Sequence, residues 1–255
     1  DVGDAAAGLD LLVVVDGAPG GAAAGIVDGA RDAGLLPEPI VVAADAAEPA
    51  VTICLDAMER DEHLQYMLVS LRQHDRYTFD HSCNVALIAV AVARSMGFKG
   101  EDLRRFATAA LLHDIGKLYT PLSVLNKPGK FTPEERKAMR RHPQDGMEIL
   151  DGAGHENEYS ERVTLLHHVG FDGNGYPANA RSEPDIFAHL VQVADIYDAF
   201  TSIRPYRQQA RPREVLEVLR QGVGHQFSPV AVDATLKLMG GTPLASVLKL
   251  DNGQL

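Results

Sequence analysis

Hydrophobic residues recur along most of the chain with the period of an α-helix. The four large apolar residues from Leu64 to Leu71 follow the spacing i, i+3, i+4, i+7, which places them on one helical face. The same kind of pattern begins at about Val51 and predicts further helices over residues 81–96, 103–118, 143–150, 161–168, 184–202, 212–220 and 229–239.

Local signals mark the ends of several of these helices. Residues 75–80 interrupt the helical pattern, so His81 is predicted to open the next helix, and Gly97 is predicted to terminate it. Thr132 precedes a proline and two glutamates, a combination typical of a helix start with a capping box. Only residues 246–250 have the pattern of a strand in this part of the chain, so we expect an all-α domain.

Residues 1–50 differ in composition from the rest. They are rich in Ala and Gly and contain no His, Cys or aromatic residue. Apolar runs at 9–15 and 39–44 predict short strands, with a helix over 22–33 between them. We therefore expect a small α/β-like or irregular N-terminal extension, or a fragment of a regulatory domain, ahead of a catalytic domain over 51–255.

Composition and charge limit the kinds of partner. The chain has 255 residues, 45% of them hydrophobic, enough for one large domain with a sizeable core. Its net charge of −11 argues against a nucleic-acid polymer, which needs a basic surface. A small phosphorylated ligand stays compatible, because a metal ion can supply positive charge locally.

Two cysteines and the absence of long apolar runs bear on location. Cys54 and Cys83 do not suggest a disulfide framework, so a reducing cytoplasm is expected. No apolar run approaches the ~20 residues of a membrane span. The chain begins at Asp1 and is interpreted as a processed chain or a piece of a longer protein.

Two adjacent histidines end an apolar helical run and precede a glycine-rich loop. His167 and His168 stand where a helix gives way to the turn dipeptides of residues 172–175, and Pro177 follows. Imidazole is a common metal ligand, and this placement can direct both rings into one cavity. The alternative is a surface loop whose histidines are merely polar.

A second ionisable pair falls within an apolar run. His113 and Asp114 lie in a segment that is expected to face the core, where charged groups need a partner or a metal. Lys117 lies on the same side. A buried ion pair between Asp114 and Lys117 is the alternative, but it leaves His113 unexplained.

Further polar residues at helix positions add to this set. His81 and His142 could each be ordinary helix-terminal histidines with solvent contact. Asp195 and Asp198 lie three residues apart on an apolar helix, and the neighbours of Asp195 indicate that it faces the core. Taken together, five histidines and two aspartates, Asp114 and Asp195, can converge. Mixed His and carboxylate ligands suit Fe, Mn or Zn, and two clusters sharing a carboxylate suit a two-metal phosphoesterase.

These residues occur in an order that resembles a known family. The matching stretches are Asp75-Arg76-Tyr77-Thr78 with His81, Leu111–Lys117, Lys127–Lys130 with Glu134–Arg136, His142-Pro143 with Gly146, His167-His168 with Asp172–Pro177, and Val193–Asp195 with Asp198 and Arg204–Arg207. Over roughly 51–250 the chain resembles the HD-GYP phosphodiesterases, a branch of the HD metal-dependent phosphohydrolases.

The resemblance implies an HD-type helical bundle that hydrolyses the bacterial messenger cyclic di-GMP to pGpG and/or GMP. It implies two divalent metal ions, Fe or Mn, that hold a bridging water and lower its pKa so that the resulting hydroxide attacks phosphorus. The implied ligands of the first metal are His81, His113, Asp114 and Asp195; those of the second are His142, His167 and His168, with Asp114 bridging. The implied catalytic residues are Asp114 and Lys117, and the implied substrate-binding residues are Lys117, Gly175, Tyr176, Pro177, Arg204 and Arg207.

Two positions depart from the family pattern. Tyr77 stands where some members carry the glutamate of a third metal, so two metals are expected here. Val169 replaces the glutamate that usually follows the paired histidines, which puts the loop or a neighbouring contact in question. The resemblance also implies a bacterial cytoplasmic protein, with diguanylate cyclase or other signalling domains and a homodimer as candidate partners.

Two alternative functions stay open from the sequence. One is hydrolysis of another nucleotide or cyclic dinucleotide, because metal ligands report the reaction type better than the base. The other is a non-catalytic signalling module that binds the messenger. The intact ligand set argues against such a module, since a pure binder need not keep every ligand.

Overall fold

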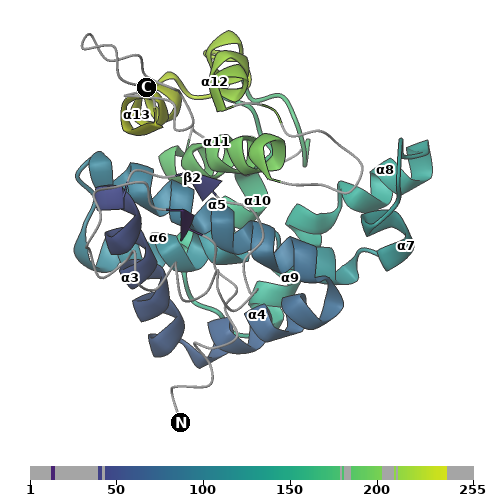
Figure 1. Ribbon diagram of the computed structural model, residues 1–255. Coiled ribbons are helices and arrows are strands. Elements are labelled where there is room, and N and C mark those ends of the chain that lie inside the picture. Colours follow the sequence, from purple (N-terminus) through teal and green to yellow (C-terminus); the bar gives the residue numbers. More distant parts are fainter. Residues whose placement is uncertain are drawn as a thin grey trace, which may run out of the picture.

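The helices pack in layers around one central helix. The structure is a computed structural model, and it describes residues 13–14, 40–41, 44–178, 180, 185–202, 210 and 212–239. Its helices, shown in Figure 1, are α3 (Ala44–Arg60), α4 (Glu62–His74), α5 (Arg76–Ser95), α6 (Gly100–Leu112), the 3₁₀ helix η1 (Ile115–Tyr119), α7 (Leu122–Leu125), α8 (Pro133–Met139), α9 (His142–Gly152), α10 (Glu158–Leu166), α11 (Ile186–Thr201), α12 (Pro212–Gln221) and α13 (Pro229–Met239).

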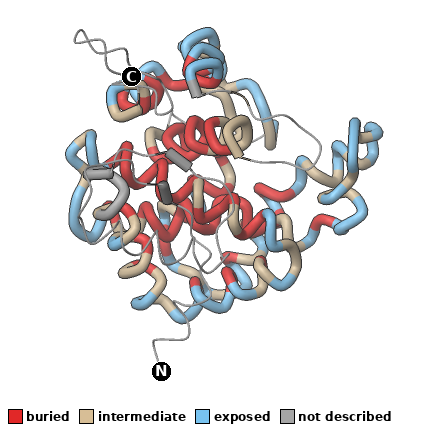
Figure 2. The backbone as a smooth tube through the Cα atoms, in the orientation of Figure 1, coloured by how far each residue is buried: buried red, intermediate tan, exposed pale blue. Residues whose placement is uncertain are grey.

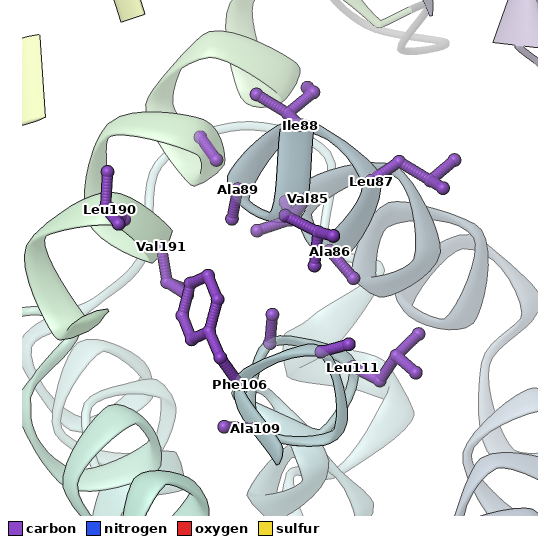
Figure 3. Close-up of a cluster of buried hydrophobic side chains, with 14 of the residues drawn as sticks. Val85, Ala86, Leu87, Ile88, Ala89, Phe106, Ala109, Leu111, Leu190 and Val191 are labelled. Carbon is purple, nitrogen blue, oxygen red and sulfur yellow. The ribbon is translucent and has the colours of Figure 1, made fainter. Parts of the chain in front are cut away.

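The central helix is α5, and its middle is apolar all round. Every residue from Val85 to Ala93 is at most 3% exposed. A helix with this pattern must be covered on all sides, and α3, α4, α6 and α11 pack against it. Figure 2 shows the buried segments concentrated on α5, α6 and α11. In Figure 3, the ring of Phe106 from α6 points toward Val191 of α11 and joins these two helices to the core.

The predicted start of α5 at His81 was wrong. The helix begins at Arg76, because Asp75 acts as its N-cap and its carboxylate accepts a hydrogen bond from the backbone N–H of Thr78 at 2.8 Å. The interruption between α4 and α5 is therefore one residue, Asp75, which ends α4 as well. As a consequence His81 lies in the second turn, where it is only 5% exposed.

The predicted single helix over 103–118 was also wrong. The α-helix ends at Leu112, residues 113 and 114 form a turn, and a 3₁₀ helix starts at Ile115. Gly116 lies so close to α9 that a Cβ atom there would approach the carbonyl oxygen of His142 to 1.9 Å. This close approach explains why the apolar run does not continue as one straight helix.

The remaining expectations have different outcomes. Thr132 and Glu135 form the reciprocal capping box predicted at the start of α8. In the extension, β1 (Val13–Val14) and β2 (Ile40–Val41) pair in parallel, within the segments predicted as strands. Helix α3 runs across the expected domain boundary at residues 50 and 51. The predicted helix over 22–33 and strand over 246–250 lie outside the described residues.

No helix among the residues that the structure describes combines the length and apolar character needed to cross a bilayer.

Candidate metal centre

Five structural elements bring histidines and aspartates together around Asp114. The contributing residues are His81 from α5, His113 and Asp114 from the turn between α6 and η1, His142 from the first turn of α9, His167 and His168 from the end of α10, and Asp195 from α11. The group Asp114, His142, His167 and His168 can offer ligand atoms within 4.8 Å of one another, and so can the group His81, His113 and Asp114.

Asp114 is shared between these two groups through its two oxygens. Its Oδ2 lies 3.3 Å from Nε2 of His113 and 3.8 Å from Nε2 of His81. Its Oδ1 lies 3.3 Å from Nε2 of His142 and 3.8 Å from Nε2 of His167. One carboxylate therefore faces four imidazole nitrogens, all from residues that are at most 5% exposed.

Hydrogen bonds at the far side of each ring decide which nitrogen faces Asp114 as a lone pair. Nδ1 of His113 lies 2.8 Å from the carbonyl oxygen of Ala110, and Nδ1 of His142 lies 2.8 Å from that of Met139. Nδ1 of His167 is 3.0 Å from the carbonyl oxygens at the end of α10. A carbonyl oxygen can only accept, so each Nδ1 is assigned the proton and each Nε2 a lone pair.

These lone pairs meet without a protein donor, which is the test of whether the residues suit a cation. Nε2 of His142 and Nε2 of His167 are only 3.1 Å apart, although both are acceptors in the assigned tautomers. Nε2 of His113 and Oδ1 of Asp114 are buried and have no hydrogen-bond partner. Buried acceptors without a donor are costly, and divalent cations held between them would satisfy these acceptors, so this donor set fits metal binding.

Burial keeps His142, His167 and His168 neutral. It lowers the pKa of His142 to about 4 and that of His168 to about 3, and it lowers the pKa of His167 well below its usual value. Burial opposes the ionisation of Asp114 as well, but the nearby Lys117 and His113 outweigh it and hold the pKa of Asp114 well below its ordinary range. At neutral pH Asp114 is thus a carboxylate beside the neutral imidazoles of His142, His167 and His168, the protonation states that metal binding by these residues requires.

His81 lies between two aspartates of α11. Its Nδ1 is 2.5 Å from Oδ2 of Asp198, and its Nε2 is 3.1 Å from Oδ1 of Asp195. Burial would lower the pKa of His81, but hydrogen bonds to these carboxylates outweigh it and raise it to about 9. A metal ion bound at Nε2 would take the place of a proton there. Asp198 is itself fully buried and also accepts a hydrogen bond from Ser202 at 2.6 Å, so it is held in position to orient His81.

Lys117 donates a hydrogen bond to Oδ2 of Asp114. This is the contact expected if Lys117 were a structural partner of Asp114. Its side chain is nevertheless 18% exposed, whereas that of Asp114 is 2% exposed, so Lys117 is the solvent-accessible partner of this pair. From there the same cation can also reach an anion that enters the site.

The loop after His168 folds back onto the paired histidines. Val169 forms an isolated antiparallel bridge with Gly175, and the N–H of Tyr176 donates to the carbonyl oxygen of His168 at 3.3 Å. Gly175 has φ 125°, and a Cβ atom there would lie 2.2 Å from that carbonyl oxygen, so the position requires glycine. The Tyr176 ring stacks on His168, with centroids 4.5 Å apart.

The sequence-predicted residues are thus placed unevenly. All seven predicted metal ligands and Lys117 lie in or beside the cluster, and the segment 175–177 borders it. Arg204 and Arg207 lie outside the described residues. Sequence reasoning missed Gln192, whose Nε2 donates to the carbonyl oxygen of Val169 at 3.2 Å and so supports the loop. The amino-acid sequence carries no signal for this role, because a single glutamine on a buried helix face resembles any other buried amide side chain.

Comparison with known proteins agrees with this architecture. The profile of the HD domain family matches residues 63–230. The chain belongs to the HD domain family. Membership implies the use of a divalent metal, for which the His and Asp cluster offers candidate ligands.

Two curated relatives have printed functions. The chain is 37% identical over 189 residues to "Cyclic di-GMP phosphodiesterase PA4108" of Pseudomonas aeruginosa, covering 74% of this chain and 45% of the relative. It is 40% identical over 154 residues to "Cyclic di-GMP phosphodiesterase response regulator RpfG" of Xanthomonas campestris, covering 59% of this chain and 40% of the relative. The matches therefore span less than half the length of these two relatives.

A solved structure has the same fold. The HD domain of the L. monocytogenes phosphodiesterase PgpH, crystallised with cyclic di-AMP, superposes with a TM-score of 0.51 at 19% identity. The superposition covers 71% of this chain and 99% of that one. At this identity the likeness concerns the fold alone.

Proposed function

We propose that this chain is a metal-dependent phosphodiesterase that hydrolyses cyclic di-GMP to pGpG and/or GMP. The observation that carries the proposal is the convergence of buried imidazole lone pairs on the two oxygens of Asp114. Such a cluster suits cations that bind and polarise a phosphodiester. The two relatives named as cyclic di-GMP phosphodiesterases supply the substrate class.

Two divalent ions, Fe or Mn, are the proposed cofactors. His81, His113, Asp114 and Asp195 are the proposed ligands of one ion, and His142, His167 and His168 those of the other, with Asp114 shared. The division into two groups that meet at Asp114 supports a pair of ions over a single one. Tyr77 lies beside His81 where a third site would need a carboxylate, and its ring stacks on that imidazole at 6.3 Å.

The protein groups have separate proposed roles in the reaction. When bound, the metal ions would supply a water of lowered pKa and stabilise charge on the phosphoryl oxygens. Asp114 and the neutral histidines would hold the metal ions in a buried site, where the positive charge of the ions is poorly screened. Lys117 would offer a further positive charge to a phosphoryl oxygen, and Gly175, Tyr176 and Pro177 are proposed substrate contacts on the loop that packs on His168. Arg204 and Arg207 stay predicted substrate contacts.

Elemental analysis together with turnover tests this function. Protein purified without added metal is expected to retain close to two Fe or Mn ions per chain and to convert cyclic di-GMP to pGpG or GMP. Asp114→Asn preserves the shape of the side chain but removes the shared anion, so it should lose both metal and turnover. Wild-type protein that holds two metals and leaves cyclic di-GMP intact would disprove the substrate assignment.

A different cyclic dinucleotide is the second candidate substrate. The related fold of PgpH was crystallised with cyclic di-AMP, so this architecture by itself does not select a guanine base. Parallel turnover of cyclic di-GMP and cyclic di-AMP separates the two substrates. A binding module without turnover would need neither the unpartnered lone pairs nor two metals, and the metal assay distinguishes it from either hydrolase.

The remaining expectations concern context. A catalytic unit over 51–255, an extension or regulatory fragment over 1–50, a bacterial cytoplasmic location and association with signalling domains or a second copy remain predictions.

A further inference from the structure

Arg140 forms the outer end of a stack of side chains that begins at the metal centre. Arg140 is the exposed C-cap residue of α8, two positions before His142. Its guanidinium carbon lies 5.1 Å from the centre of the Tyr176 ring. That ring stacks on His168, with centroids 4.5 Å apart and planes at 28°. The stacked side chains of Arg140, Tyr176 and His168 therefore form a row from solvent to a candidate metal ligand.

The charge of Arg140 is not neutralised by a neighbouring carboxylate. Arg141 pairs with Asp145 at 2.9 Å, and Lys127 pairs with Glu135 at 2.6 Å. Among the described residues, Arg140 has no ion pair, and its contact is with the Tyr176 ring. In a chain of net charge −11, this guanidinium is therefore available to an anion that approaches the metal centre.

We propose that Arg140 binds the second phosphate of the cyclic dinucleotide, the one that is not being hydrolysed; this rests on the function proposed above. A cyclic dinucleotide carries two phosphates on opposite edges of one macrocycle. The cluster around Asp114 takes one of them, and the ring of Tyr176 separates that cluster from the guanidinium. The planar fork of an arginine matches two phosphate oxygens.

This role differs from that of the metal ligands. The second phosphate has the same charge in the bound substrate and in the transition state, so a contact with it contributes equally to both. Loss of such a uniform contact raises KM and leaves kcat nearly unchanged. The stack on Tyr176 also holds the guanidinium in place before the substrate arrives, which limits the cost of ordering a long side chain.

The experiment compares metal-loaded wild-type protein with Arg140→Met and Arg140→Lys. Substrates are cyclic di-GMP, with two phosphates, and bis(p-nitrophenyl) phosphate, with one. For Arg140→Met, KM for cyclic di-GMP should rise about 10- to 100-fold, the scale of one lost hydrogen-bonded charge contact. The ratio of kcat/KM for the two substrates should shift at least about tenfold against cyclic di-GMP. Arg140→Lys keeps the charge without the fork and should fall between.

Arg94→Met is the matched control. Arg94 is an exposed arginine in the last turn of α5, remote in sequence from His81 on the same helix. Its substitution removes the same charge and should leave both substrates unaffected.

Inhibition by linear dinucleotides separates a phosphate contact from a guanine contact. The inhibitors are pGpG and its analogue with an uncharged methylphosphonate in place of the internal phosphodiester. Both keep the two guanines and the 5′-phosphate, which is the group that the hydrolysed bond leaves. Arg140→Met should weaken inhibition by pGpG and affect the analogue much less. An equal loss for both inhibitors would indicate a guanine contact and overturn the proposal.

The remaining outcomes are also decisive. If Arg140→Met loses metal, or loses both substrates in parallel, Arg140 merely supports the centre and the proposal is wrong. An unchanged KM for cyclic di-GMP overturns it as well. Failure of the proposed function is visible separately, because wild-type protein would then not turn over cyclic di-GMP at all.

Discussion

Gly116 gives the most direct test of how the centre is assembled, because it lies where η1 meets α9. A Cβ atom at this position would lie 1.9 Å from the carbonyl oxygen of His142 and 2.4 Å from the amide nitrogen of Gly146. Both are backbone atoms, so no side-chain rotation can relieve the contact. Gly116→Ala must therefore move η1 and α9 apart by roughly 1 Å or more.

That displacement separates two candidate metal ligands, one positioned by each element. Asp114 precedes η1, His142 begins α9, and Oδ1 of the first lies 3.3 Å from Nε2 of the second. A misplacement of about 1 Å in a catalytic site can cost ~10²-fold in rate. Overpacking of this kind also costs about 1–3 kcal/mol in the free energy of unfolding. We expect kcat/KM to fall by ~10²-fold or more, and the metal content to fall with it.

The assay combines metal content per folded chain, urea unfolding and turnover. Gly152→Ala is the control, because it adds the same methyl group at the end of α9, the helix that Gly116 packs against, where a Cβ atom would meet nothing within 4 Å. The control should keep wild-type metal and turnover, and its stability should change by at most ~1 kcal/mol. A Gly116→Ala protein with wild-type metal content and turnover would refute the claim that this close approach sets the position of His142.

Three further predictions concern single side chains. Lys117→Met should keep the metal content but lower kcat by about 10²–10³-fold; normal kcat per metal-loaded chain would make Lys117 only a structural partner of Asp114. Asp198→Asn removes the negative charge that orients His81 through its Nδ1, so the metal affinity, measured by competition with a chelator, should fall by roughly 10–100-fold; unchanged affinity would contradict that role. Burial raises the pKa of Cys54 to about 12, so its thiol stays protonated below that pH and should react with a thiol reagent at about pH 8 only after unfolding in urea; rapid labelling of the folded protein would contradict the structure.

The residue pattern was sufficient for the helical architecture. Apolar residues at helical spacing predicted α4, α9 and α11 to within a few residues, and the capping signals of Thr132 predicted the start of α8. These features depend on neighbours a few positions away, so they can be read from the chain itself. Candidate ligands were found for a related reason, since histidines in apolar segments stand out wherever the helices later pack.

Helix ends inside the core could not be predicted in this way. Residues 113 and 114 leave the helix although the apolar pattern continues, because Gly116 packs against the backbone of α9, and that contact joins residues distant in sequence. His81 was predicted to open a helix, yet Asp75 caps that helix several residues earlier, so the imidazole lies in the second turn and is buried.

The sequence by itself determined which residues can bind a metal, and only the tertiary structure decided how they are presented. The lone pairs of His113 and His142 face Asp114 because carbonyl oxygens of Ala110 and Met139 accept a hydrogen bond from the opposite side of each ring. No residue type specifies that choice, since an imidazole can carry its proton on either nitrogen. Side-chain chemistry is local and can be read from the sequence, whereas the orientation of a ligand depends on which backbone atoms the fold places behind it.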